Sequence, residues 1–161
     1  QQQSLTIANT DTSDSLHGAL SELAAPLLLD SLNNLENSTA TAQDDSQATY
    51  ATKIDKQELI VDWQQPAEII ARKVRALYSR AFMYFEHKQQ RIKLWEVRAE
   101  ENNNHLAPGT IISVNKNGVV IACADGALCV ENLQLPGGKN LQFSQLLNSK
   151  PDLFVEKQTI G

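Results

Sequence analysis

Two turn dipeptides, Asn117-Gly118 and Asp125-Gly126, constrain the fold of this chain more than any other feature. They separate three short apolar runs, at residues 110–114, 118–123 and 127–133. Asn-Gly and Asp-Gly accept positive φ at both central positions of a tight turn, so they are the strongest short-range signals for a β-hairpin. The sequence therefore predicts three antiparallel strands joined by tight turns.

Further elements surround these strands. Residues 81–86 and 91–97 alternate in the manner of strands around a turn at 87–90. We expect a short closing helix around residues 144–148. Pro66 suits the first turn of a helix that ends near Tyr78. On this helix Ile70, Val74 and Leu77 share one face and Glu68, Arg72 and Arg75 the other. Residues 53–63 alternate in part, which predicts a strand or an extended arm. The predicted fold class is mainly β: a small OB-like β-barrel with one or two helices.

The N-terminal stretch has a different pattern. Leu5 and Ile7 alternate with polar residues, which predicts a short strand. After a polar cap cluster at 10–14, apolar residues recur at spacings of three and four, which predicts a helix over residues 16–35. We expect Pro26 to kink this helix or to restart it near residue 25.

A polar stretch separates this helix from the rest of the chain. Residues 37–47 contain no large apolar side chain, so they predict a linker. Residues 1–52 hold seven acidic residues and no Lys or Arg, whereas residues 53–161 hold all 14 basic residues and 12 acidic ones. The composition and the charge therefore change together near residue 48.

The net charge of −5 hides a basic segment at residues 72–98, which has eight basic residues and two acidic ones. Strict alternation in 91–97 places Arg91, Lys93, Trp95 and Val97 on one strand face, and Ile92, Leu94 and Glu96 on the other. Cations beside an aromatic ring suit a nucleic-acid surface, because they meet phosphates while rings stack on bases. A solvated face with Trp95 packed against a neighbour is the alternative, and both remain open.

Other classes of site find little support. No apolar run of about 18 residues is present, so no membrane span is expected. We expect His17, His87 and His105 to be three separate exposed residues, and we expect no metal site and no catalytic group of residues. The stretch 136–139 departs from a phosphate-binding loop, so we interpret it as a glycine turn with an exposed Lys139. Since the chain opens with Gln1 and its one methionine is Met83, we expect a fragment without a signal peptide.

Two cysteines are too few for a disulfide scaffold and fit a reducing cytosol. With a two-residue turn at 125–126, Cys123 would lie opposite Leu128, and Cys129 opposite Ala122. We expect two buried small hydrophobic residues, with a redox role as the alternative.

An ordered series of motifs resembles the C-terminal part of the methionyl-tRNA formyltransferase family. The series covers about residues 48–155, and the whole order is more specific than any one piece. It comprises Lys53-Ile54, Val61-Asp62-Trp63, Pro66-Ala67-Glu68-Ile69, Arg75-Ala76, Arg91-Ile92-Lys93-Leu94-Trp95, Pro108-Gly109-Thr110-Ile111, Gly118, Asp125-Gly126-Ala127-Leu128, Leu133-Gln134, Pro136-Gly137-Gly138-Lys139 and Leu146-Leu147-Asn148.

The resemblance implies a division of the chain and a function. Residues 1–36 would be the strand-helix remnant of an α/β catalytic domain, 37–50 a linker, and 51–161 an OB-like tRNA-binding domain. The family is cytoplasmic and transfers a formyl group from 10-formyltetrahydrofolate to the amino group of methionyl initiator tRNA. No catalytic motif of the family occurs here, so we expect no catalytic residue, no cofactor in this chain and no activity without the missing N-terminal catalytic domain. The residues expected to bind tRNA are Arg72, Arg75, Arg80, Lys88, Arg91, Lys93, Trp95 and Lys139.

Two alternatives remain. Related formyltransferases that act on sugar nucleotides, and formyltetrahydrofolate dehydrogenases, carry similar C-terminal domains. Alternatively, the chain is an interaction module without a nucleic-acid role, which associates with itself through the apolar helix 16–35.

Overall fold

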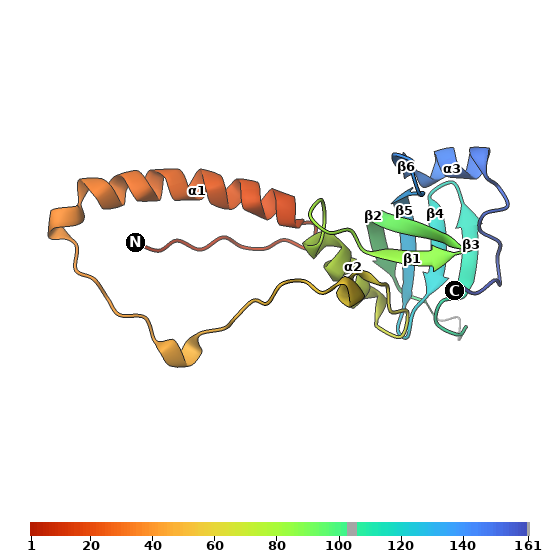
Figure 1. Ribbon diagram of the computed structural model, residues 1–161, viewed down its shortest axis with the longest axis horizontal. Helices are drawn as coiled ribbons and strands as arrows, with labels where there is room; N and C mark the ends of the chain where they lie inside the picture. Colours follow the sequence, from red (N-terminus) through yellow and green to blue (C-terminus); the bar gives the residue numbers. More distant parts are fainter. Residues whose placement is uncertain (103–105, 161) are drawn as a thin grey trace. The chain divides into compact units, whose positions relative to one another are not determined.

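The computed structural model describes residues 1–102 and 106–160 (Figure 1). The chain divides into two compact units, residues 1–55 and residues 56–161.

The first unit contains one long helix, α1 (Ser13–Asn33). Thr12 caps its N-terminus: the Thr12 hydroxyl accepts a hydrogen bond from the Ser15 N–H at 3.2 Å, and the Ser15 hydroxyl accepts one from the Thr12 N–H at 3.0 Å. The helix runs without interruption past Pro26, so the predicted restart near residue 25 is wrong. No α1 residue is buried: Leu16, Leu23 and Leu27 are half-buried, and the exposed leucines are Leu20, Leu28, Leu29 and Leu32.

The remainder of the first unit is irregular. Residues 5–7 do not form the predicted strand, because no neighbouring strand pairs with them. After α1 come two short 3₁₀ turns, Leu35–Asn37 and Asp45–Gln47, and all residues from 37 to 55 are exposed. No helix within the described ranges is both long and apolar enough to cross a membrane.

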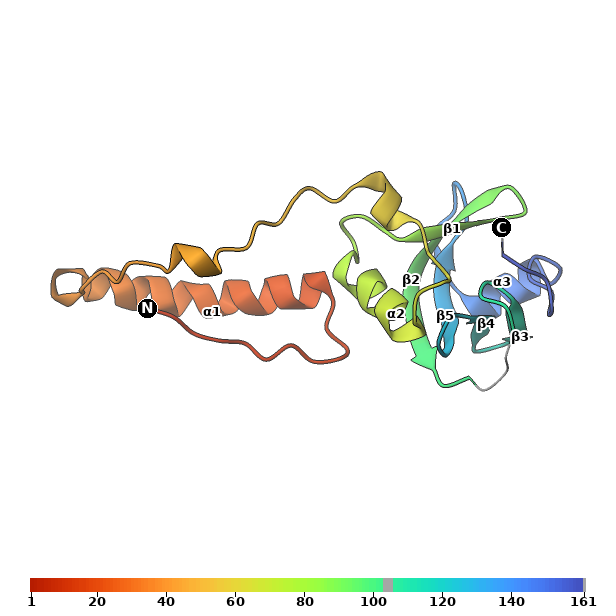
Figure 2. The same ribbon diagram turned by 90° about the horizontal axis from the view of Figure 1, so that it is seen from below.

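The second unit is built on an antiparallel sheet. Its strands are β1 (Tyr84–His87), β2 (Gln90–Glu100), β3 (Ile111–Asn115), β4 (Gly118–Ala122), β5 (Ala127–Gln134) and β6 (Asn140–Gln142). The hydrogen-bonded order is β1-β2-β5-β4-β3, and β6 pairs with β5. The sheet curls into a half-barrel, so the prediction of a mainly β, OB-like fold is confirmed (Figure 2).

Two helices cover parts of the sheet. Helix α2 (Ala67–Ala76) follows Pro66, as predicted, and packs on β2 and β5. Helix α3 (Phe143–Ser149) packs on β4, β5 and β6, away from α2 (Figure 2). Ile70 and Val74 of α2, Leu94 and Val130 of the sheet, and Phe143 of α3 all belong to one buried core. Burial of this apolar surface is the main stabilising term of the unit.

The segment before α2 differs from the predicted arm. Residues Lys56–Leu59 form a 3₁₀ turn, and the only regular pairing of this segment within the described chain is a bridge from Ile60 to Tyr84. Val61 then donates its N–H to the Tyr84 carbonyl at 2.9 Å, which covers the open edge of β1.

Both predicted hairpins exist, but their turns are placed differently. The β3–β4 ladder ends at Asn115↔Gly118, so Lys116 and Asn117 form the turn and Gly118 begins β4. The β4–β5 ladder ends at Ala122↔Ala127, so four residues, 123–126, form that loop. Neither Asn117 nor Asp125 adopts positive φ, whereas Gly126 does, at +73°.

The predicted alternation along β2 also fails beyond Trp95. The ladder with β5 pairs Leu94 with Leu133 and Glu96 with Asn132, which leaves Trp95 as an extra residue, a β-bulge. A second bulge follows on β5, where Glu131 is the extra residue without a partner in the ladder. Val97 then pairs with Val130. Val97 therefore packs toward the core and Glu96 is exposed, the reverse of the prediction.

Candidate nucleic-acid interface

Arg91, Lys93 and Trp95 come together on the outer side of β2, as the alternation predicted. Ile92 and Leu94 between them are buried, which turns the two cations outward. Tyr84 on β1 lies opposite Lys93 in the ladder, and Tyr78 and Phe82 belong to the segment between α2 and β1. We call this set the aromatic–basic surface: Tyr78, Phe82, Tyr84, Arg91, Lys93 and Trp95.

Aromatic rings support both cations of this surface. The Arg91 guanidinium lies over the Tyr84 ring, 4.1 Å from its centroid. The Lys93 ammonium lies 5.6 Å from the centroid of Phe82. Such cation–π contacts contribute about 0.5–1 kcal/mol each at exposed positions, and they limit the freedom of two long side chains.

Trp95 is a packed residue more than an open stacking platform. Its ring lies 4.2 Å from Phe82 and 5.7 Å from Tyr78, centroid to centroid, and its side chain is half-buried. The Trp95 Nε1–H donates a hydrogen bond to Gln134 Oε1 at 3.2 Å. These contacts favour the packing interpretation of Trp95 that the sequence left open.

Gln134, at the end of β5, connects Trp95 to the glycine turn. Its Nε2 donates to the Gly138 carbonyl at 2.7 Å, while its Oε1 accepts from Trp95. Lys93 and Gln134 are also partners in the β2–β5 ladder. The turn 136–139, predicted as a glycine turn, is therefore held beside the cations of β2.

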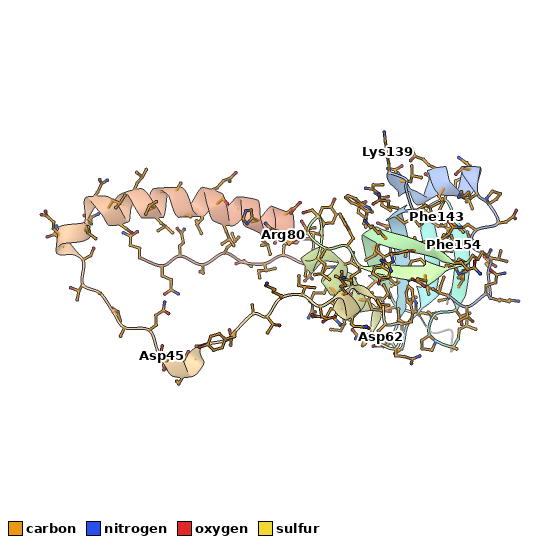
Figure 3. All side chains as sticks on the ribbon, viewed as in Figure 1. Asp45, Asp62, Arg80, Lys139, Phe143 and Phe154 are labelled. Atoms are coloured by element: carbon orange, nitrogen blue, oxygen red, sulfur yellow. The ribbon has the colours of Figure 1, made fainter. Side chains whose placement is uncertain are left out.

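The other predicted tRNA-binding residues lie on several elements. Arg72 is exposed on α2 and Arg75, on the same helix, is half-buried. Arg80 is exposed between Tyr78 and Phe82, and Figure 3 shows it on the segment after α2. Lys139 projects into solvent from the turn before β6 (Figure 3).

Two cations of the basic segment are already engaged within the protein. Lys88, in the β1–β2 turn, donates from Nζ to the Asp152 carbonyl at 2.6 Å. Arg98 forms ion pairs with Glu100 at 2.7 Å and Glu131 at 3.1 Å, and the hydrogen bond to Glu131 raises its pKa. Counting basic residues in the sequence therefore overestimates the positive charge that this segment offers to a ligand.

Four residues of this region escaped the sequence analysis. Phe82 and Tyr84 alternate with the buried Met83 and Phe85. The alternation of residues 82–86 could therefore have predicted that Phe82 and Tyr84 face outward. Tyr78 and Gln134 left no such signal, because their contacts depend on the register of β2 with β5 and on the path after α2.

The cysteines and histidines form no reactive centre in the described part of the chain. Cys123 and Cys129 are free and buried, as expected, and burial raises their pKa values to about 12 and about 11. Because the β4–β5 loop has four residues and not the two predicted, Cys129 lies opposite Val120 in the ladder and not opposite Ala122. Cys123 lies in that loop. His17 is exposed as predicted, and His105 lies outside the described residues. No group of three metal-ligating side chains occurs among the described residues.

His87 is buried, so the prediction of an exposed residue is wrong. Its Nε2 lies 3.0 Å from the Leu153 carbonyl, which requires Nε2 to carry the proton, and its ring stacks on Phe154. Its Nδ1 has no hydrogen-bond partner. The C-terminal segment after α3 packs over the end of β1 and covers this side chain, a contact that local sequence does not reveal.

This environment predicts a pH-dependent stability. Desolvation lowers the pKa of His87 in the native state, so below about pH 6.5 the unfolded chain binds a proton more readily than the native one. The free energy of unfolding should therefore fall as the pH drops through this range. Urea unfolding at several pH values measures it. The variant His87→Gln should flatten the dependence, and exposed His17→Gln should leave it unchanged; equal slopes in all three proteins would contradict the assignment.

Comparison with known proteins places these observations in a family context. Residues 53–151 match the family model described as formyl transferase, C-terminal domain. The chain is 38% identical over 157 residues to a protein named methionyl-tRNA formyltransferase from Pseudomonas fluorescens. That match covers 96% of this chain and 49% of the relative, so the chain spans about half the length of the relative.

Solved structures share the fold at low sequence identity. A variant of HypX from Aquifex aeolicus superposes with a TM-score of 0.65 at 18% identity, covering 89% of this chain and 27% of that protein. HypX from the same organism in complex with tetrahydrofolic acid gives a TM-score of 0.58 at 19% identity, covering 78% of this chain and 23% of that protein. At these identities the likeness extends to the fold alone.

Proposed function

Because the chain belongs to the formyl transferase C-terminal domain family, we propose that it is the tRNA-binding part of a methionyl-tRNA formyltransferase. The whole protein would transfer a formyl group from 10-formyltetrahydrofolate to the amino group of methionyl initiator tRNA, in the cytoplasm. The observation that carries this proposal is the match to such an enzyme along almost the entire chain. The aromatic–basic surface supports it with cations that face outward.

The proposal divides the chain by role. Residues 1–36 are the end of the catalytic domain, 37–50 a linker, and 51–161 the tRNA-binding domain. The seven cations predicted from the sequence remain the proposed tRNA contacts, and Trp95, the eighth predicted residue, acts through packing. These cations are Arg72, Arg75, Arg80, Lys88, Arg91, Lys93 and Lys139. The catalytic motif of the family does not occur in this sequence, and His87, the one described histidine of the second unit, is buried with its Nε2 held by the Leu153 carbonyl. We assign the donor and every step of the transfer to the rest of the protein.

Salt dependence tests this function directly. Phosphate contacts release counterions, so about four of them would lower the affinity for initiator tRNA by about a hundredfold between 50 and 200 mM salt. Fluorescence anisotropy with labelled initiator tRNA at the two salt concentrations measures the change. We expect steep salt dependence and no formylation by this chain alone. Binding that is absent or independent of salt would overturn the proposal.

The exposed leucines of α1 support a second candidate, an interaction module. Leu20, Leu28, Leu29 and Leu32 are 51–63% exposed within the first unit. Self-association through this helix predicts a dimer by light scattering that is lost when residues 1–47 are removed. A monomer in both cases would leave only the tRNA-binding proposal.

A further inference from the structure

A small hollow opens on the aromatic–basic surface, between β2 and the glycine turn that follows β5. It is lined by Arg91, Lys93, Gln134, Leu135, Pro136 and Gly137. Two of these side chains are cations and none is acidic. We infer that this hollow binds one backbone phosphate of the RNA, with Arg91 and Lys93 in contact and with Tyr84 and Gln134 as positioning residues. The inference rests on the RNA-binding function proposed above.

The cations of the hollow are ordered before any ligand arrives. Tyr84 supports the Arg91 guanidinium at 4.1 Å, so binding a phosphate costs less side-chain entropy than it would for a free arginine. Glu86 is the nearest competing charge, 3.8 Å from Arg91, but both side chains are more than half exposed. Such an exposed pair is weak, so a phosphate can replace the carboxylate.

The opposite wall of the hollow is fixed by Gln134. Its two hydrogen bonds, to Trp95 at 3.2 Å and to Gly138 at 2.7 Å, hold the turn against β2. Gly137 has φ +70°, and a Cβ added there would meet nothing within 4 Å. The turn is therefore held on its inner side and open on its outer side, where a phosphate can approach.

Other cations near the hollow already have partners within the protein, so fewer of them are available to contact a phosphate. Lys88 is bound to the Asp152 carbonyl and Arg98 to two glutamates. Arg91 and Lys93 are the β2 cations whose described contacts, aromatic rings and one long ion pair, leave their N–H donors to a ligand. The hollow between these two side chains and the turn therefore combines two cations available to a ligand with a concave surface that a phosphate can enter.

Charge removal at the hollow is the first test. The double variant Arg91→Gln/Lys93→Gln should weaken initiator tRNA binding at least tenfold and reduce the slope of log K against log salt by about 1.5. The matched control Lys116→Gln/Lys150→Gln removes the same charge from exposed sites elsewhere and should weaken binding less than threefold. Equal losses in the two variants would overturn the assignment of the hollow.

Tyr84 gives a test of positioning. Tyr84→Leu removes the ring below Arg91 and should weaken binding about threefold to fivefold, the fold-change that corresponds to one exposed cation–π contact. Tyr84→Phe keeps the ring and should restore affinity to within twofold of the original chain. If both variants bind equally, Tyr84 does not position Arg91.

An NMR titration of the unmodified chain removes any dependence on variant folding. Initiator tRNA should shift the amide resonance of Gly137 and the indole resonance of Trp95 more than those of Lys116 and its neighbours. Salt-dependent binding without shifts at Gly137 would refute the hollow but leave the RNA-binding function standing. Absence of any binding by the unmodified chain would refute the function itself.

Discussion

Replacing Gly118 with alanine is expected to lower the free energy of unfolding by about 3 kcal/mol, at the upper end of the cost of overpacking a core. A Cβ at this position would lie 2.6 Å from the Cys129 Sγ and 2.7 Å from the Val130 carbonyl oxygen. Both atoms belong to β5, the central strand of the order β1-β2-β5-β4-β3. The methyl group can therefore be accommodated only if β4 moves away from β5.

Gly137 provides the matched control for this prediction. It has positive φ, at +70°, but no atom within 4 Å of an added Cβ. Gly137→Ala should therefore cost about 1 kcal/mol from backbone strain alone. Urea unfolding followed by circular dichroism gives both values. A cost for Gly118→Ala no larger than that for Gly137→Ala would show that β4 and β5 do not approach as closely as described.

Replacing Phe154 with alanine is expected to cost about 4 kcal/mol, as for other large core aromatics. Its ring lies 6.3 Å from Phe85, 5.8 Å from Phe143 and 5.2 Å from His87, centroid to centroid. Figure 3 labels Phe143 and Phe154, whose rings lie next to each other in the second unit. The change therefore leaves a cavity beside β1 and α3 and loosens the segment that covers His87.

The next residue in the chain is the control. Val155 is 41% exposed, so Val155→Ala should change stability by less than about 0.5 kcal/mol. Thermal and urea unfolding measure the difference between the two variants. We also expect Phe154→Ala to weaken the pH dependence of stability, because solvent then reaches the His87 ring. Equal stability of the two variants would mean that this segment does not stabilise the unit.

Much of the fold could be predicted from local patterns. The hairpins around residues 116 and 125, helix α2 after Pro66, and helix α1 with its Thr12 cap follow from turn chemistry, periodicity and capping. The placement of Gly118 could not, because its role is a close approach to β5 and not a turn conformation. The strand expected at 5–7 shows the same limit, since a strand exists only beside a partner.

The candidate site was predicted in part. The alternation of 91–95 correctly turned Arg91 and Lys93 outward, because Ile92 and Leu94 had to be buried. It failed to place Val97, because a bulge changes the phase of a strand without any mark in composition. Contacts across the sheet, such as Gln134 with Trp95, depend on register, and register is a property of two segments at once.

The two bulges on β2 and β5 offset each other's shift in register. Trp95 is the extra residue on one strand and Glu131 on the other, and the pairing regains its original register beyond them. Deleting either residue alone would leave a single bulge, in which two residues of one strand oppose one residue of the other, with Leu94 and Val97 still facing the core. Deleting both would restore a regular ladder with the same core residues inward. The register beyond the bulges is therefore kept by two matched extra residues, one on each strand, although 35 residues lie between them in the sequence.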